Sequence, residues 1–189
     1  MRVITGTARG RKLKTLENKN LDTGEYDVRP TSDGVKEAIF SAVQFDIEDE
    51  TVIDLFAGSG QLGIEALSRG ALKAVFTDNN PAAIAVIKDN LAATGFTEQA
   101  EIRNSPCSAY LKSTAESFGI AFADPPYGRG HIEKILPVVM PKMNGHGIIV
   151  CEHEKELSLP EYGGWAMKLY RHGKTSVTIY RKEAQTEQD

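Results

Sequence analysis

The chain has 189 residues, which is long enough for one α/β domain with a sizeable core and a short extension. An apolar fraction of 41% and a charged fraction of 25% are typical of soluble globular proteins, and the absence of any run of about 18 apolar residues excludes a membrane-spanning helix. The net charge of −4 argues against a polyanionic partner for the molecule as a whole, so the distribution of charge matters more than its total.

Basic residues are concentrated at the N-terminus. Residues 1–19 carry six basic side chains against one acid, so the rest of the chain is acidic. A basic arm is typical of proteins that contact nucleic-acid phosphates through one patch, but charge alone slightly favours a solvated tail. Residues 2–4 have the pattern of a short strand and residues 5–20 that of a loop or hairpin, with no signal peptide. We predict a basic RNA-contacting extension over residues 1–28.

Alternating helix and strand patterns begin at residue 29. Thr31 or Ser32 is a candidate N-cap for a helix that carries Val35, Ile39 and Val43 on one face. Strand patterns cover residues 52–56, 74–77, 100–103, 120–123 and 147–151, and helix patterns cover residues 62–69, 82–93, 107–117 and 131–140. This alternation predicts a mostly parallel, doubly wound sheet that helices cover on both faces.

The C-terminal part has a different pattern. Residues 166–170 and 176–180 are two strand patterns joined by a short basic turn, which predicts an antiparallel hairpin at the sheet edge. We therefore expect an α/β domain over residues 29–182 and a polar tail over residues 183–189.

The sequence indicates no metal site and no disulfide. Cys107 and Cys151 lie far apart and lack the spacing of metal ligands, as do the four histidines. We predict that both cysteines are reduced thiols in a cytoplasmic protein.

A glycine-rich loop lies where the first strand gives way to its helix, and it reads Asp54-Leu55-Phe56-Ala57-Gly58-Ser59-Gly60. Ligands of open α/β sheets bind at the carboxyl ends of strands, where glycines allow a close backbone approach. Asp78 ends the second strand, where its carboxylate can accept hydrogen bonds from both hydroxyls of a ribose. Residues 58–63 also match the G-x-G-x-x-G fingerprint, so NAD is a rival ligand. S-adenosylmethionine is favoured because Asp54 would repel a pyrophosphate but suits the ammonium group of a methionine, and because the chain is short for a dehydrogenase.

The most informative motif follows the fourth strand and reads Asp124-Pro125-Pro126-Tyr127. This strand is expected beside the first one, so that both loops face one crevice. The exocyclic amine of a base is a poor nucleophile because its lone pair is delocalised into the ring. Hydrogen bonds to Asp124 and to the carbonyl of Pro125 would direct that lone pair towards a sulfonium methyl, while the base stacks on Tyr127. The alternative is an ordinary strand-end turn.

These motifs resemble those of the RsmD family, bacterial methyltransferases that modify N2 of guanine 966 in 16S ribosomal RNA. Four stretches in the family's order carry the resemblance. They are Arg-Gly-Arg-Lys-Leu at residues 9–13, Arg-Pro-Thr-Ser-Asp at 29–33 with residues 35–40, the glycine loop at 54–60 with residues 62–71, and Asp-Pro-Pro-Tyr at 124–127. The first two stretches distinguish this family from other amino-methyltransferases.

The resemblance implies the seven-stranded Rossmann-like fold of S-adenosylmethionine-dependent methyltransferases, with S-adenosylmethionine as the methyl donor. The implied substrate is 16S rRNA in an assembling 30S subunit, and we expect a monomer that uses no metal. The expected catalytic residues are Asp124, Pro125, Pro126 and Tyr127. The expected cofactor-binding residues are Arg29, Pro30, Thr31, Asp54, Phe56, Ala57, Gly58, Gly60, Asp78, Asn79, Asn104, Ser105 and Asp124. The expected RNA-binding residues are Arg9, Arg11, Lys12, Arg171 and Lys174.

Two positions depart from the family's pattern. Gly34 stands where the family usually has a larger, often basic residue. Residues 104–105 read Asn-Ser, where such enzymes often place an aspartate that holds the adenine amino group. Asn104 can take over that contact through its side-chain carbonyl.

For several of these residues a purely structural role is the alternative to ligand binding. Phe56 has the alternative of packing under the loop, Asn79 that of capping the next helix, and the hairpin around His172 that of a solvated turn. Glu152, at the end of the fifth strand, is expected to be exposed. Among whole-protein functions, adenine-N6 methylation is the nearest rival, and an NAD enzyme or a non-catalytic nucleotide-binding module is the rival of another class.

Overall fold

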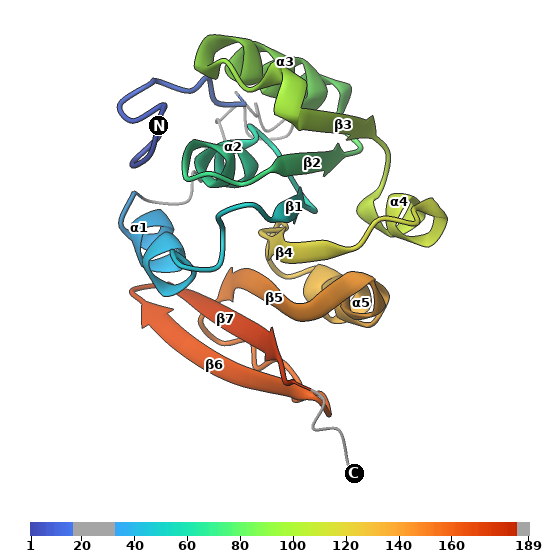
Figure 1. Cartoon of the computed structure of the whole chain (residues 1–189). Coiled ribbons are helices and arrows are strands. Elements are labelled where there is room, and N and C mark those ends of the chain that lie inside the picture. The colour runs from blue at the N-terminus through green and yellow to red at the C-terminus, as the bar shows by residue number, and fades with distance from the viewer. Residues whose placement is uncertain (17–32, 185–189) are drawn as a thin grey trace, which may run out of the picture.

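A seven-stranded sheet forms the centre of the molecule, with the strand order β3-β2-β1-β4-β5-β7-β6 (Figure 1). The computed structural model describes residues 1–16 and 33–184. The strands are Thr51–Asp54 (β1), Lys73–Asp78 (β2), Ala100–Asn104 (β3), Phe118–Ala123 (β4), Met143–Glu154 (β5), Trp165–His172 (β6) and Thr175–Lys182 (β7). The helices are Asp33–Ala42 (α1), Gln61–Ser68 (α2), Pro81–Thr94 (α3), Cys107–Ser113 (α4) and His131–Val139 (α5), with 3-10 turns at Thr97–Gln99 (η1) and Met140–Lys142 (η2).

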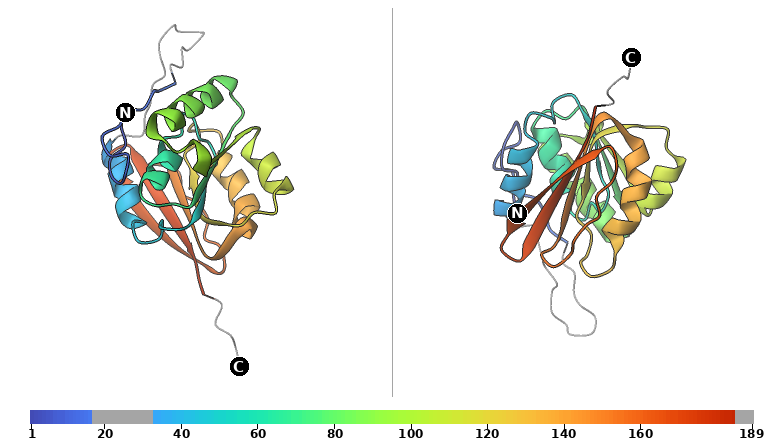
Figure 2. Two further views of the ribbon diagram at one scale, coloured as in Figure 1. Left: turned by 45° about the horizontal axis from the view of Figure 1, so that its top comes forward. Right: turned by 90° about the horizontal axis from the view of Figure 1, so that it is seen from below.

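The predicted fold class is confirmed. Strands β1 to β5 pair in parallel, whereas β7 pairs antiparallel with both β5 and β6. Helices cover both faces of the sheet, α1 to α3 on one and α4 and α5 on the other (Figure 2). Successive side chains of a strand point to opposite faces. Val52 of β1 accordingly joins the core under α1 to α3, and Ile53 joins the core under α4 and α5. Burial on both faces explains why the central strands are nearly continuous apolar runs.

Two elements of the α/β domain differ from their predicted bounds by more than two residues. The strand expected over residues 147–151 extends over Met143–Glu154, because β5 pairs with β4 from Met143 and with β7 as far as Glu154. The helix expected over residues 107–117 ends at Ser113.

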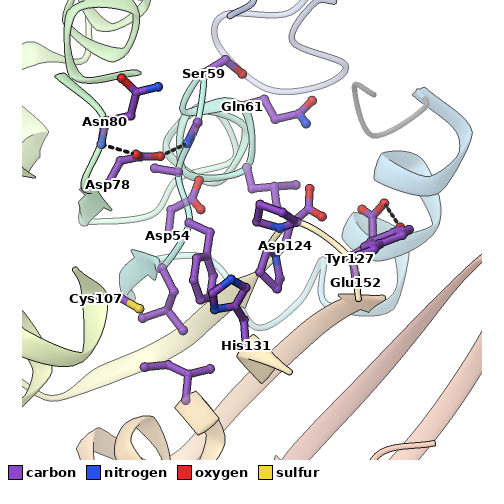
Figure 3. Close-up of a pocket in the computed structure, with 18 of the residues that line it drawn as sticks. Asp54, Ser59, Gln61, Asp78, Asn80, Cys107, Asp124, Tyr127, His131 and Glu152 are labelled. Carbon is purple, nitrogen blue, oxygen red and sulfur yellow. Dashed lines mark hydrogen bonds between the residues drawn. The ribbon is translucent and has the colours of Figure 1, made fainter. Parts of the chain in front are cut away.

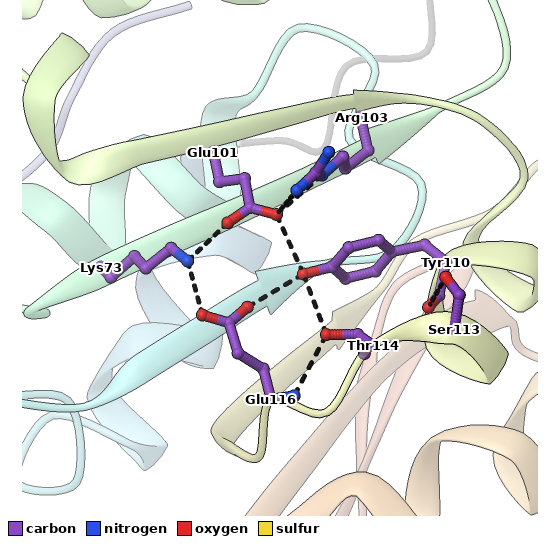
Figure 4. A network of polar contacts seen from close by, with 7 residues as sticks. All are labelled: Lys73, Glu101, Arg103, Tyr110, Ser113, Thr114 and Glu116. Carbon is purple, nitrogen blue, oxygen red and sulfur yellow. Dashed lines mark hydrogen bonds and ion pairs between the residues drawn. The ribbon is translucent and has the colours of Figure 1, made fainter.

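A polar network lies beside the segment between α4 and β4 (Figure 4). Lys73 Nζ of β2 lies 2.5 Å from carboxylate oxygens of both Glu101 and Glu116. The backbone N–H of Glu116 donates to Thr114 Oγ1 at 3.1 Å. These contacts hold Glu116 beside the start of β2, in the short segment between the end of α4 at Ser113 and the start of β4 at Phe118.

Residues 1–16, which we call the basic arm, pack onto the body. The N–H of Val3 donates to the carbonyl of Arg11 and the N–H of Leu13 to that of Met1, so the arm begins as a hairpin. Val3, Ala8 and Leu13 are buried, and Glu65 of α2 accepts hydrogen bonds from two backbone N–H groups of the arm. The solvated tail that charge alone favours is therefore wrong for residues 1–16. Burial of these three apolar side chains favours the docked arm, although the residues around them are basic and exposed.

Some expectations fall outside the described residues. These include the contacts of Arg29, Pro30 and Thr31, the Thr31 or Ser32 cap and the end of the polar tail. Within residues 1–16 and 33–184, every helix is too short or too polar to cross a membrane.

Candidate active site

The glycine loop and the Asp-Pro-Pro-Tyr loop leave adjacent strands and open onto one cleft (Figure 3). Strand β1 lies beside β4, with Asp54 opposite Phe122. The cleft has a volume of about 1100 Å³, and both loops line it, with Asp54 and Gly58 from the first and Asp124 and Tyr127 from the second. The crevice expected at the switch point of the sheet is therefore present.

Backbone geometry holds the glycine loop against the end of β2. Gly58 has a φ of +53°, and its N–H donates to Asp78 Oδ2 at 2.9 Å. The other carboxylate oxygen of Asp78 accepts the N–H of Asn80 at 2.8 Å. Gly60 has a φ of +79°, and a side-chain carbon there would lie 3.3 Å from Ile87. The loop thus needs glycine at both positions, and it fixes the Asp78 carboxylate at the rim of the cleft.

Asp54 lies buried beneath the glycine loop. Its Oδ2 accepts the backbone N–H of Gly63 at 3.2 Å. Burial, with smaller contributions from the charges of Asp124 and Asp78, raises the pKa of Asp54 to about 7. A cation that enters this part of the cleft would stabilise the ionised carboxylate.

Tyr127 is held by groups from two other strands. Its hydroxyl donates to Glu152 Oε1 of β5 at 3.3 Å and shares a hydrogen bond with Thr175 Oγ1 of β7 at 3.2 Å. Figure 3 shows Asp124 on the side of this pair that faces Asp54. The ring of Tyr127 is therefore fixed in the wall of the cleft near Asp124.

Comparison with known proteins identifies the family. A family model described as Conserved hypothetical protein 95 matches residues 1–181. The chain belongs to this family.

Its relatives agree with the resemblance to the RsmD family, which is confirmed. The chain is 36% identical to YlbH of Bacillus subtilis (strain 168), over 96% of this chain and 99% of that protein. It is 34% identical to Ribosomal RNA small subunit methyltransferase D of Escherichia coli (strain K12), over 100% of this chain and 93% of that protein. The solved structure of yhhF from Escherichia coli superimposes with a TM-score of 0.84 at 32% identity, covering 98% of this chain and 99% of that one.

Most of the expected catalytic and cofactor-binding residues of this RsmD family member line the cleft. They are Asp54, Phe56, Ala57, Gly58, Asp78, Asn79, Ser105, Asp124, Pro125, Pro126 and Tyr127. The ring centre of Phe56 lies 5.7 Å from that of His131, which also lines the cleft. Asn80 caps α3 by accepting the N–H of Ala82 at 2.9 Å, so capping is not the role of Asn79.

Among the expected cofactor-binding residues that the structure describes, Gly60 and Asn104 do not line the cleft. Gly60 lies under the loop as the first turn of α2 begins. Asn104 donates through Nδ2 to the carbonyl of Asp78 at 3.1 Å, and its neighbour Ser105 faces the cleft instead. The contact between Asn104 and adenine stays a prediction.

The expected RNA-binding residues lie at the surface. Arg9, Arg11 and Lys12 are exposed on the hairpin of the basic arm, and Arg171 is exposed on β6. Lys174 lines the edge of the cleft, in the turn between β6 and β7. Their contacts with RNA stay predictions.

Glu152 is a residue of the cleft that the sequence did not reveal. The prediction that it is exposed is wrong, since only 5% of it is accessible. The pairing of Ala123 with Cys151 places Glu152 alongside Asp124 at the carboxyl end of the next strand. Its position directly after the apolar run 147–151 matches that of Asp124 after β4, and this is the signal that would have identified it.

Cys107 brings a thiol to the cleft, at the start of α4. Burial raises the pKa of Cys107 to about 11, so the thiol stays protonated at neutral pH and is a poor nucleophile. Across residues 1–16 and 33–184, no three His, Cys, Asp or Glu side chains come together in a way that could hold a metal ion.

Proposed function

We propose that this protein transfers the methyl group of S-adenosylmethionine to N2 of a guanine in 16S rRNA, within an assembling small ribosomal subunit in the cytoplasm. The observation that carries the proposal is the cleft shared by the glycine loop and the Asp-Pro-Pro-Tyr loop. The name of the relative from Escherichia coli, Ribosomal RNA small subunit methyltransferase D, supports an rRNA substrate. We expect the protein to act as a monomer without a metal.

The wall of the cleft between β1 and α4 suits S-adenosylmethionine. Asp78, whose carboxylate is oriented by two backbone N–H groups, can accept hydrogen bonds from the ribose hydroxyls. The buried carboxylate of Asp54 suits the ammonium group of the methionine portion. Ser105 and Cys107 lie beyond Asp78, where they would contact the adenine. When bound, the cofactor supplies an electrophilic methyl group on a positively charged sulfur.

The other end of the cleft favours guanine over adenine. Asp124 and Glu152 bring two carboxylates to the wall on which Tyr127 offers a stacking surface. Guanine presents N1–H and N2–H donors side by side on its Watson–Crick edge, whereas adenine presents its amine next to the N1 acceptor. Carboxylate oxygens accept hydrogen bonds from both guanine groups and repel the lone pair of adenine N1.

The protein's part in the reaction is to position and polarise the amine. Asp124 and the carbonyl of Pro125 accept its hydrogens, which weakens delocalisation of the lone pair into the ring. Pro125 is buried, and the fixed φ of two successive prolines keeps these acceptors in place. After methyl transfer the nitrogen is positively charged, and Asp124 stabilises that charge until the proton leaves.

A binding measurement separates the NAD-binding rival from the proposed function. A pyrophosphate of NAD would lie near Asp54 and Asp78, which disfavours it. We expect the protein to bind S-adenosylhomocysteine more tightly than NAD, and a preference for NAD would refute the proposal. Adenine-N6 methylation shares the same cofactor and is distinguished by the modified base.

The modified base is identified by mass spectrometry of 16S rRNA. In a strain that lacks this protein, we expect one guanine to lose its N2 methyl group. The purified protein with S-adenosylmethionine should restore that group on small-subunit particles from the strain. An unchanged methylation pattern, or loss of a methylated adenine instead, would overturn the assignment.

A further inference from the structure

The side chain of Asn90 joins the basic arm to the glycine loop. Asn90 lies on α3 and is only 1% exposed. Its Oδ1 accepts the backbone N–H of Lys14 at 2.8 Å. Its Nδ2 donates to the carbonyl of Lys14 at 3.0 Å and to the carbonyl of Ser59 at 2.8 Å. The hydrogen bonds of this amide therefore tie together two segments that lie far apart in the chain.

The end of the arm beyond Lys14 forms part of the cleft. Thr15 and Leu16 line it together with Gly58 and Asp78. A side-chain carbon at Gly58 would lie 3.9 Å from Leu16 Cδ1, so the arm passes close over the glycine loop. Asn90 thus holds both the glycine loop and the end of the basic arm, and these two segments line the same part of the cleft.

We propose that Asn90 is a positioning residue that couples RNA binding by the basic arm to cofactor binding at the glycine loop. Arg9, Arg11 and Lys12 precede Lys14 by two to five residues on the same segment. RNA bound to these residues restrains the segment that follows them and so favours docking of its end, residues 14–16, which completes the cofactor end of the cleft. By thermodynamic linkage, RNA and cofactor then raise each other's affinity by the same factor. The inference rests on the proposed function, because RNA and S-adenosylmethionine are its two ligands.

The alternative is that Asn90 only satisfies buried backbone groups and so stabilises the fold. The arm offers a way to separate the two roles, because its first half is held independently. Glu65 accepts the N–H groups of Ile4 and Thr5 at 2.8 and 2.9 Å, and Ser68 Oγ accepts that of Ala8 at 3.0 Å. A change at Lys14 should therefore release only the end of the arm.

The test compares two substitutions at one exposed position. Lys14→Pro removes the N–H that donates to Asn90, whereas Lys14→Ala keeps it. Both variants lose the ion pair between Lys14 and Asp89, which lie 2.7 Å apart, so they differ in the backbone donor. Calorimetric titration with S-adenosylhomocysteine, alone and in the presence of small-subunit particles from the strain that lacks this protein, measures the cofactor Kd and the coupling to rRNA.

We expect the wild-type protein and Lys14→Ala to bind S-adenosylhomocysteine equally well, and RNA to tighten that binding by at least roughly 5-fold. Lys14→Pro should bind it more weakly and lose the tightening. Identical behaviour of Lys14→Pro and Lys14→Ala would overturn the inference.

Asn90→Ala provides a second, independent variant. At a temperature where circular dichroism shows it folded, it should also lose the tightening by RNA, and retained tightening would count against the inference. If the wild-type protein binds no S-adenosylhomocysteine, the proposed function itself fails. If it binds but RNA leaves the Kd unchanged, only the coupling fails.

Discussion

Two aspartates at the ends of adjacent strands have different surroundings, and this difference separates their roles. Asp54 is buried, and its pKa is raised to about 7. Asp124 is half-buried and lines the cleft beside the wall that holds Tyr127. Asp54 therefore suits the ammonium group of the cofactor, and Asp124 suits the exocyclic amine of the base that enters with the substrate.

The raised pKa of Asp54 predicts a pH-dependent affinity for the cofactor. Below pH 7 the free protein protonates Asp54, whereas a bound ammonium group favours the ionised form and lowers its pKa. Binding therefore releases a proton near pH 7, and affinity for S-adenosylhomocysteine should fall roughly ten-fold between pH 8 and pH 6. Titration calorimetry measures the change, and Asp54→Asn should flatten it. Equal Kd values at pH 6 and pH 8 in the wild-type protein would contradict this role.

Asp124→Asn tests the orientation of the amine. The amide is isosteric but lacks the charge that polarises the amine, so the methylation rate should fall by roughly 100-fold or more. S-adenosylhomocysteine should still bind within a few-fold of the wild-type Kd. Loss of cofactor binding instead would mean that Asp124 serves the cofactor.

The sequence alone predicts that Asp54, Asp78 and Asp124 lie together, because each of them stands at the carboxyl end of a parallel strand. It does not predict the burial of Glu152. That burial depends on the extension of β5, which pairs on one side with β4 and on the other with β7.

Among the elements, the edge hairpin contributes more to the cleft than its sequence suggests. Thr175 begins β7 and contacts the Tyr127 hydroxyl, while Lys174 borders the cleft from the turn before it. The hairpin therefore helps to orient the ring of Tyr127, on which we expect the base to stack.

Thr175→Val should lower kcat/KM for RNA by a few-fold while leaving the Kd of S-adenosylhomocysteine unchanged, because it removes one of the groups that orient Tyr127. Tyr127→Phe removes the shared hydroxyl, so the double variant should be no worse than Tyr127→Phe alone. Steady-state kinetics of the two single variants and the double variant measures this coupling. Additive losses would show that Thr175 acts elsewhere.

The basic arm predicts a defined salt dependence. Arg11→Ala combined with Lys12→Ala should weaken association with 16S rRNA and reduce the slope of log K against log salt concentration by about two charges' worth. Lys112→Ala on α4, on the other face of the sheet, is the control and should leave the slope unchanged. An unaltered slope in the double variant would remove the arm from the RNA interface.

The alternation of apolar runs with helical patterns was sufficient to predict the central strands of the sheet. A strand that is buried on both faces is apolar at nearly every position, so it is visible in the sequence as an apolar run. The packing of the arm was not predictable in this way. Val3, Ala8 and Leu13 are spaced by five residues, which fits neither a helix nor a strand. Glu65 and Asn90, whose side chains bind the backbone of the arm, lie far along the chain.

For the whole molecule, the reversal of strand order between β1 and β4 creates the crevice, and the chain ends complete it. The arm comes from the first 16 residues and the hairpin from the last 20 described ones, and they reach the cleft at its cofactor end and beside Tyr127, respectively. The topology of an α/β sheet predicts the crevice, but only the three-dimensional structure shows which distant segments enclose it.

We propose that this cleft brings the N2 amine of a guanine to the methyl donor. The most direct measurement is methyl transfer by the purified protein to small-subunit particles reconstituted with guanine, inosine or adenine at the mapped position. Inosine keeps the N1–H of guanine but lacks the 2-amino group. We expect only the guanine particle to be methylated, at N2. Methylation of the inosine or adenine particle at a similar rate would contradict it.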